Sequence, residues 1–377
     1  MQPTFWLHFG CTEYSKNGEK QYKTGQNQLL EKPYKSTGKI DKARAPLNRR
    51  FSVAPMMDWS DRHCRYFWRL LSSQTVLYTE MVTTGALLHG DVARHLAHDA
   101  AEHPLAVQLG GSDPKDLAHA AKLCEQAGYG EINLNVGCPS ERVQSGAFGA
   151  CLMNEPHTVA NGIKAMRDAV SIPVTIKCRI GVDDNDSYAA LSEFVAINQE
   201  AGCSTFIIHA RKAWLSGLSP KQNREVPPLN YPMVFQLKRD FNALEIILNG
   251  GIKTLEDCRA ALKQLNGVMI GREAYQNPYL LERVDADIFG DQQAPLQSRL
   301  DIATAYAPYI EQQLSRGSRL NHMTRHILGL FNGMPGARQW RRYISENAHK
   351  TGAGIDVYLQ SLNIISDAHR LAQQRQP

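Results

Sequence analysis

Residues 104–136, PLAVQLGGSDPKDLAHAAKLCEQAGYGEINLNV, contain the repeating unit on which the fold depends. Its two ends, Pro104–Leu109 and Glu131–Val136, are short and mostly apolar, which is typical of strands buried on both faces. Between them, Asp113 and Pro114 begin a helical pattern that ends at Gly128, with a capping side chain first and a glycine last. The stretch predicts a strand, a helix and a second strand parallel to the first.

The same unit recurs along the chain. Helical patterns of the same kind occupy Asn154–Ala169, Asp186–Ala201 and Thr254–Leu265. Eight units over roughly 235 residues predict an α/β fold, a (β/α)8 TIM barrel, whereas a doubly wound sheet would use only about six. The eight strand candidates are Phe51–Met56, Thr75–Glu80, Pro104–Leu109, Glu131–Val136, Pro173–Arg179, Thr205–His209, Glu245–Leu248 and Gly267–Ile270.

The two ends of the chain differ from this pattern. Residues 1–48 are rich in Lys, Gln, Asn, Gly and Ser without a sustained period, and we expect a flexible basic tail. The barrel is expected over residues 49–290. Residues 296–377 lack strand patterns and predict a C-terminal all-helical bundle domain. Its four helices are expected at Leu296–Leu314, Arg319–Phe331, Gly336–Ala348 and Ile355–Gln374.

The composition is that of a globular protein. The 377 residues are 43% hydrophobic and 21% charged, which excludes wholesale disorder. No run approaches the about 18 apolar residues that cross a bilayer, and the N-terminus lacks a signal-peptide pattern, so we expect no membrane association. The eight cysteines are scattered without a CxxC pair, which indicates reduced thiols of a cytoplasmic protein and no metal site.

The formal charge of +5 is unevenly distributed. Seven basic residues and one acidic residue, Glu346, lie between Arg316 and Lys350, inside the expected helical domain. A basic segment on an otherwise acidic body suggests a docking site for a polyanion, with nucleic acid as the leading candidate. A solvated helix face remains the alternative from charge alone.

A turn that contains glycine follows each of the last two strands of the expected barrel. Gly250 and Gly251 follow the seventh strand, and Gly271 with Arg272 follows the eighth. Barrels of this class bind phosphate at these two loops, where backbone N–H groups can approach a ligand closely. Either pair alone could be an ordinary turn, but together they predict a phosphate site.

Polar side chains end strands three to six at one level of the barrel. They are Gln108, Asn135, Lys177 and His209. Two amides, an ammonium and an imidazole around one pocket suit the polar edge of a heteroaromatic ring. Lys177 beside such a ring would stabilise a reduced, anionic flavin.

Seven motifs also carry a family resemblance. They are APMMDW, AVQLGG, INLNVGCP, TIKCRIG, IIHAR, ILNGGI and IGREAY, in order from residue 51 to about 275. This series resembles the flavin-dependent tRNA-dihydrouridine synthases. The segment Ser219–Arg224 and the motif GMPGARQWRR resemble the A-type branch, which reduces the D-loop uridines 20 and 20a.

The resemblance implies a cofactor, a reductant and a general acid. NADPH, or NADH, would reduce FMN, and Cys138 would protonate C5 of the uridine after hydride reaches C6. Asn135 would contact the uridine or the flavin edge. The FMN-binding residues would be Pro55, Met56, Met57, Gln108, Lys177, His209, Asn249, Gly250, Gly251, Gly271 and Arg272.

A tRNA substrate requires a docking surface, because the target uridine must leave its stack to reach a buried site. Backbone contacts from basic side chains would position the folded RNA. We expect these from Lys221 and Arg224 after the sixth strand and from Arg338 and Arg341 in the helical domain. No obligate protein partner is indicated. Two alternatives stay open: a flavin dehydrogenase of free pyrimidines and a non-catalytic RNA-binding protein.

Overall fold

The structure, a computed structural model, describes residues 47–144 and 146–374. The prediction of a basic tail therefore falls almost wholly outside the described residues. None of the helices in the described part is long and apolar enough to cross a membrane.

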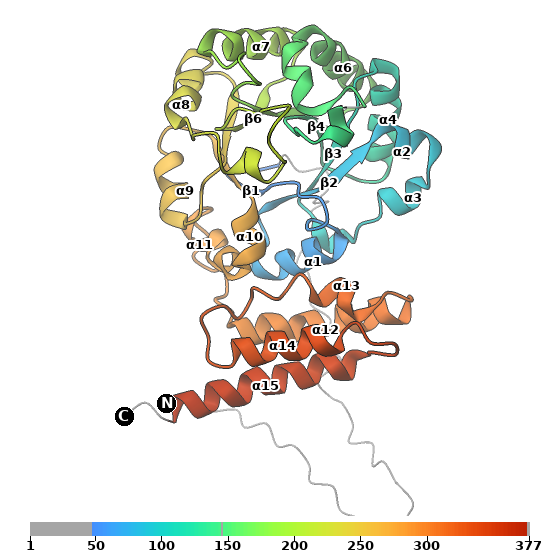
Figure 1. Cartoon of the computed structure of the whole chain (residues 1–377), viewed down its shortest axis with the longest axis vertical. Helices are drawn as coiled ribbons and strands as arrows, with labels where there is room; N and C mark the ends of the chain where they lie inside the picture. Colours follow the sequence, from blue (N-terminus) through green and yellow to red (C-terminus); the bar gives the residue numbers. More distant parts are fainter. Residues whose placement is uncertain (1–46, 145, 375–377) are drawn as a thin grey trace, which may run out of the picture. The chain divides into compact units, whose positions relative to one another are not determined.

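Eight parallel strands close into a barrel in sequence order, as predicted (Figure 1). Closure comes from β1 and β8, where Phe51 lies opposite Val268 and Val53 opposite Ile270. The strands are β1 Phe51–Val53, β2 Val76–Thr83, β3 Leu105–Gly110, β4 Glu131–Val136, β5 Val174–Arg179, β6 Thr205–His209, β7 Glu245–Asn249 and β8 Gly267–Ile270.

Helices surround the barrel, and two of the four expected starts, Asp113 and Thr254, are caps in the structure (Figure 1). The helix expected from Asn154 begins at Pro156 without a side-chain cap, and the one expected from Asp186 is capped by Ser187. The Asp113 carboxylate accepts hydrogen bonds from two N–H groups of α4, and Thr254 with Asp257 forms a capping box on α9. The helices are α1 Arg62–Leu71, α2 Thr84–His89, α3 Val92–His95, α4 Pro114–Gln126, α5 Glu141–Gln144, α6 Pro156–Ala169, α7 Tyr188–Glu200, α8 Tyr231–Asp240, α9 Leu255–Ala261, α10 Arg272–Gln276 and α11 Val284–Asp287. Short 3-10 turns are η1 Ala100–Glu102, η2 Gly149–Asn154, η3 Gln222–Arg224 and η4 Pro278–Arg283.

The strands separate two cores, because successive side chains of a strand point to opposite faces. The larger core fills the space between strands and helices. The inner one is a small apolar cluster of Leu47, Ala54, Val76, Tyr78, Ala106, Ile207, Ile247 and Met269.

Besides Ile207 and Ile247, the inward faces of β4 to β7 carry polar groups, which determine where charge is buried. Arg49 lies among them, and its Nε donates to Glu131 Oε2 at 2.5 Å while its Nη1 donates to Glu245 Oε2 at 2.9 Å. A buried arginine therefore links β4 to β7 inside the barrel.

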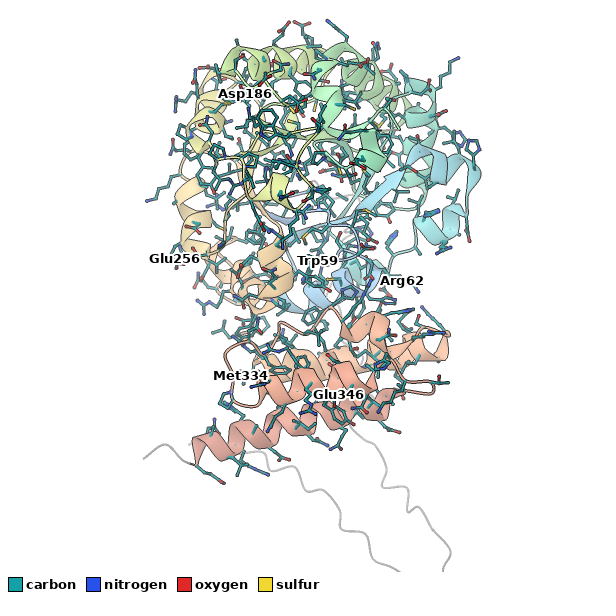
Figure 2. The ribbon with its side chains drawn as sticks, in the orientation of Figure 1. Trp59, Arg62, Asp186, Glu256, Met334 and Glu346 are labelled. Atoms are coloured by element: carbon teal, nitrogen blue, oxygen red, sulfur yellow. The ribbon has the colours of Figure 1, made fainter. Side chains whose placement is uncertain are left out.

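Four helices follow the barrel in the described residues; α12 and α13 pack against α1, and α15 packs against α12 and α14 (Figure 1). Tyr306 Oη donates to the His63 carbonyl at 3.0 Å, and Tyr309 Oη shares a 2.8 Å hydrogen bond with His63 Nδ1. Figure 2 shows Arg62 on this side of the barrel. The helices are α12 Arg299–Ser315, α13 Leu320–Thr324, α14 Ala337–Asn347 and α15 Ile355–Gln373.

The expected helix at Arg319–Phe331 is wrong in its second half. Only α13, Leu320–Thr324, is helical, and turns follow it. Two tertiary contacts favour the turns. The side chains of Arg325 and His326 bind Asp61 in the barrel, and Gly329 packs so closely on the Gln276 carbonyl that a Cβ would lie 2.4 Å from its oxygen.

A buried ion pair near the barrel gives a stability prediction. Arg65 Nε donates to Glu102 Oε2 at 2.7 Å, and both side chains are almost fully buried. Glu102→Ala leaves a buried charge without its partner, so we expect a loss of about 3–5 kcal/mol in the free energy of unfolding, measured by urea denaturation. The control, Glu256→Ala, removes an exposed pair with Arg259 and should cost under about 1 kcal/mol. Equal losses for the two variants would contradict the prediction.

Candidate active site

A cavity of 780 Å³ opens at the carboxyl ends of the strands, where barrel enzymes place their functional groups. Most of the predicted site residues meet there. Those lining the cavity are Pro55, Met56, Met57, Gln108, Asn135, Cys138, Lys177, His209, Arg224, Asn249, Gly251, Gly271 and Arg272. Four others, Gly250, Lys221, Arg338 and Arg341, do not line it.

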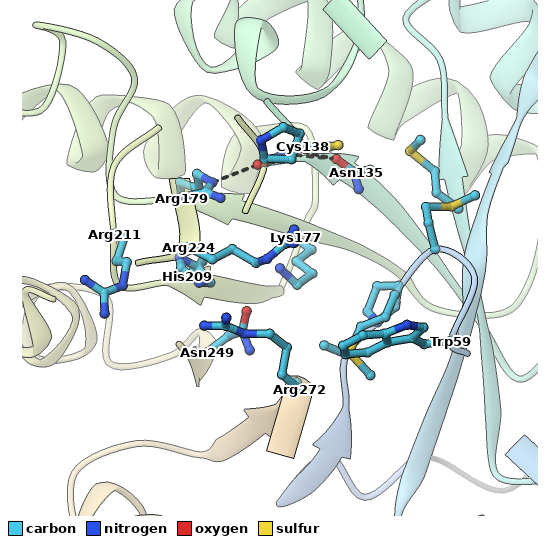
Figure 3. A pocket seen from close by; sticks show the side chains of 18 of the residues that line it. Trp59, Asn135, Cys138, Lys177, Arg179, His209, Arg211, Arg224, Asn249 and Arg272 are labelled. Atoms are coloured by element: carbon cyan, nitrogen blue, oxygen red, sulfur yellow. Dashed lines mark hydrogen bonds between the residues drawn. The ribbon is translucent and has the colours of Figure 1, made fainter. Parts of the chain in front are cut away.

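The cavity wall is predominantly cationic. Six of its lining residues are Lys or Arg, and three are Asp or Glu. Figure 3 shows Arg211, Arg224 and His209 on one side and Trp59 on the other. Positive charges gathered on a concave, partly dehydrated wall attract anions strongly. The cavity therefore favours an anionic ligand.

Lys177 and His209 respond to this environment. Burial, together with the charges of Arg179 and Arg224, lowers the pKa of Lys177 to about 8. Burial, together with the charges of Arg179 and Lys177, holds the pKa of His209 well below its usual value. His209 Nδ1 has no hydrogen-bond partner among the described residues. An anion beside these groups would favour their protonated forms.

The two glycine loops differ in how much room they leave. Gly251 has φ = 77°, and a Cβ there would lie 2.4 Å from Leu229, so local packing requires glycine. A Cβ on Gly271 would meet only Ala54, at 3.9 Å, so its backbone faces open space in the cavity. Arg272, next in the chain, pairs with Glu225 of the loop after β6.

Cys138 follows β4 on the rim of the cavity. Asn135 Oδ1 accepts hydrogen bonds from the N–H groups of Gly137 at 3.1 Å and of Cys138 at 3.0 Å. The Cys138 thiol donates to Ser140 Oγ at 3.5 Å. Cys138 is the cavity's only cysteine among the described residues (Figure 3). In the same part of the chain, no three His, Cys, Asp or Glu side chains gather as a metal site.

Arg179 has a structural part that the sequence analysis did not assign. Its Nε donates to the Gly137 carbonyl at 2.8 Å (Figure 3). Its Nη1 donates to the carbonyls of Lys212 and Asn223 at 3.0 Å each. One guanidinium thus joins the loop of Cys138 to the loop of Arg224. Arg179 lies two residues after Lys177 on the same strand, so both side chains are on the same face. This spacing could have identified Arg179 as a site residue from the sequence.

Trp59 was also missed. Its ring stacks on Tyr275 at a centroid distance of 4.3 Å and an angle of 12°. Tyr275 meets His326 edge to face, and His326 binds Asp61, so this wall of the cavity is connected to the C-terminal helices.

The predicted RNA contacts outside the cavity lie on exposed elements. Lys221 is exposed beside η3, and Arg338 is exposed on α14. Arg341 is half-buried, and its Nη1 donates to Asn332 Oδ1 at 2.5 Å. The structure therefore leaves Lys221 and Arg338 accessible to a macromolecule.

Comparison with known proteins places this site in a family. The profile described as dihydrouridine synthase (Dus) matches residues 52–368. The chain belongs to the dihydrouridine synthase family. The predicted relationship is thereby confirmed, and the match includes the barrel and most of the C-terminal helices.

Similar curated proteins carry a more specific name, tRNA-dihydrouridine(20/20a) synthase. That of Vibrio cholerae is 63% identical over 314 residues, covering 83% of this chain and 95% of the relative. That of Yersinia pestis is 63% identical over 329 residues, covering 87% and 94%. That of Escherichia coli K12 is 58% identical over 342 residues, covering 90% and 99%.

The low pKa of Lys177 can be tested in the ligand-free protein. Arg224→Gln removes a neighbouring positive charge, so the pKa of Lys177 should rise above 8, although burial keeps it below the usual value of about 10.4. The measurement is the pH dependence of Lys177 acylation, read by peptide mass spectrometry. Arg338→Gln, on α14, serves as the control and should leave the midpoint unchanged. A midpoint near 10 before any substitution would contradict the assignment.

Proposed function

We propose that this protein is a flavin-dependent tRNA-dihydrouridine synthase that reduces the C5–C6 double bond of D-loop uridines 20 and 20a. The observation that carries the proposal is a family match over residues 52–368 in a chain whose cationic barrel cavity has Cys138 on its rim. Relatives about 60% identical over most of their length carry the same name.

The cavity residues fit FMN. A volume of 780 Å³ lies in the range of cofactor sites, about 300–1,000 Å³. The unpartnered Nδ1 of His209, the lowered pKa of Lys177 and the open backbone at Gly271 all suit an anionic ligand. The other predicted residues that line the cavity would complete the binding set: Pro55, Met56, Met57, Gln108, Asn249, Gly251 and Arg272. Gly250 precedes Gly251 in the same loop but does not line the cavity.

Bound FMN, reduced by NADPH or NADH, would supply the hydride that adds to C6 of the uridine. The remaining step belongs to the chain, because C5 then needs a proton. The Cys138 thiol holds a proton at the cavity rim, and Asn135 fixes its backbone through two hydrogen bonds. Lys177 places a cation in the same cavity, where it stabilises developing negative charge.

We assign cofactor binding to residues 49–290 and tRNA binding to residues 296–377, with help from the loop after β6. Lys221, Arg224, Arg338 and Arg341 would contact the RNA backbone, which positions the substrate without reading its sequence. The described cysteines are all free, which supports a cytoplasmic enzyme.

Mass-spectrometric mapping of unmodified tRNA tests the proposal directly. After incubation with the purified protein and NADPH, a gain of about two daltons at uridines 20 and 20a is expected, since reduction adds two hydrogens. NADPH oxidation that depends on free pyrimidines, with unchanged tRNA, would instead support a pyrimidine dehydrogenase. Binding of tRNA with no mass gain would support a non-catalytic RNA-binding protein.

Removing the thiol should separate the two half-reactions. Cys138→Ala deletes the proton donor, so dihydrouridine formation should fall by about 10²–10⁴-fold while NADPH still bleaches the flavin. Stopped-flow absorbance and tRNA mapping give the two rates. Cys151→Ala, a half-buried thiol on η2, is the matched control and should keep both rates. Undiminished tRNA reduction by Cys138→Ala would remove Cys138 from the chemistry.

Charge reversal on α14 tests the docking surface. Arg338→Glu with Arg341→Glu should raise the KM for tRNA about tenfold or more and flatten its dependence on salt, because fewer phosphates are neutralised. The maximal rate should change little. Lys115→Glu with Lys122→Glu changes the charge equally on the exposed face of α4 and should leave KM unchanged. An identical KM for both double variants would rule out the assigned surface.

A further inference from the structure

A chain of hydrogen bonds runs through the barrel interior from a buried carboxylate to the backbone of Cys138. Thr175 Oγ1 donates to Glu131 Oε1 at 2.7 Å and accepts from Asn133 Nδ2 at 2.9 Å. Asn133 Oδ1 accepts from Gln108 Nε2 at 2.8 Å. Gln108 Oε1 accepts from Asn135 Nδ2 at 2.8 Å, and Asn135 Oδ1 accepts from two backbone N–H groups.

The lower end of this chain has a fixed polarity. Glu131 is fully buried and accepts from Arg49 Nε at 2.5 Å and from Tyr78 Oη at 2.7 Å. Arg49 can only donate. Burial, with the charge of Glu131, raises the pKa of Tyr78 well above its usual value, so the phenol keeps its proton and donates it. Glu131 therefore accepts from Thr175 as well.

The upper end is fixed independently. The N–H groups of Gly137 and Cys138 can only donate, so the atom of Asn135 that faces them must be its oxygen. Its nitrogen then faces Gln108. The direction of donation is therefore fixed at both ends of the chain. Both ends favour the same orientation of the three amides between them, Asn133, Gln108 and Asn135.

Thr175 connects the buried carboxylate of Glu131 to the first of these amides, Asn133. A hydroxyl has one proton, and because Thr175 gives it to Glu131, its lone pair is the acceptor for Asn133. A second acceptor, the Ile132 carbonyl at 3.5 Å, is too distant to compete. Without the hydroxyl, Asn133 Nδ2 is buried with no acceptor, so the chain loses its lower anchor and only the two backbone N–H groups still hold Asn135 in this orientation.

We propose that Thr175 and Asn133, anchored by Glu131, are positioning residues that hold the amide of Asn135 in place from below, and so strengthen its two hydrogen bonds to the loop of Cys138. This inference rests on the proposed function, in which Cys138 is the proton donor. Neither Thr175 nor Asn133 lines the cavity, and both are at most 1% exposed. They act on the site through the chain of hydrogen bonds alone.

Thr175→Val tests the proposal, because it removes the hydroxyl and keeps the shape. Amide hydrogen exchange in the holoenzyme, resolved at Gly137 and Cys138, should become about tenfold faster as the bonds to Asn135 weaken. The kcat for tRNA reduction should fall about 10–100-fold with a KM near that of the unchanged protein, since a displaced donor affects chemistry more than docking. Thr175→Ser retains the hydroxyl and should restore both measurements.

Thr205→Val is the matched control. Thr205 Oγ1 donates to the partly buried Glu245 at 2.9 Å, and Glu245 pairs with the same Arg49, but Thr205 lies outside the chain that reaches Asn135. We expect unchanged exchange at Gly137 and Cys138. Unchanged exchange in Thr175→Val, or equal acceleration in Thr205→Val or Thr175→Ser, would overturn the proposal.

The exchange measurement also separates this inference from the proposed function. It needs no turnover, so it reports on the chain of hydrogen bonds even if the protein reduces no tRNA. If Thr175→Val is not recovered folded, judged by its thermal unfolding midpoint, Thr175→Ala removes the hydroxyl without adding volume. Amide exchange at Gly137 and Cys138 and the kcat for tRNA reduction are then measured on Thr175→Ala, with the same expected outcomes.

Discussion

The closed parallel barrel depends on burying both faces of every strand, so each inward side chain must be satisfied inside a narrow space without water. The inner surface of the barrel meets this demand in two ways. β2, β3, β6, β7 and β8 all contribute to the apolar cluster, while β4, β5 and β7, with Gln108 of β3, supply carboxylates, a hydroxyl and amides that pair with Arg49 and with one another. A charge removed there would leave its partner buried and unpaired, which is far more costly than losing an exposed pair.

At the carboxyl ends of the strands, charges are not balanced by partners as they are at the base. Among the described residues the base of the barrel pairs its arginine with two carboxylates, whereas the cavity leaves cations in excess. Their mutual repulsion and dehydration are visible in the lowered pKa values of Lys177 and His209. Such an imbalance costs stability in the free protein and is relieved when an anion binds. This excess of positive charge is what supports the proposal of an anionic ligand in the cavity.

Local patterns predicted the barrel, the caps of α4 and α9 and the place of the cavity, because strand ends of one sheet share an edge whatever the loops do. Contacts between distant segments were not predictable in this way. The hydrogen bonds of Arg179 join the loop of Gly137 to that of Asn223, more than 80 residues later in the chain. The early end of α13 depends on contacts with Asp61 and Gln276 in the barrel. Periodicity carries no information about such partners.

The connection between the cavity and the C-terminal helices follows from one loop. Asp61 caps α1 through the N–H groups of His63 and Cys64, and its other oxygen accepts from Arg325 at 2.7 Å. The preceding residues of this loop carry Trp59 into the cavity wall, where Tyr275 supports its ring. The segment after α13, in the domain that we propose to bind tRNA, therefore shares a carboxylate with the loop that shapes the cavity, so Asp61 links the two parts of the chain directly.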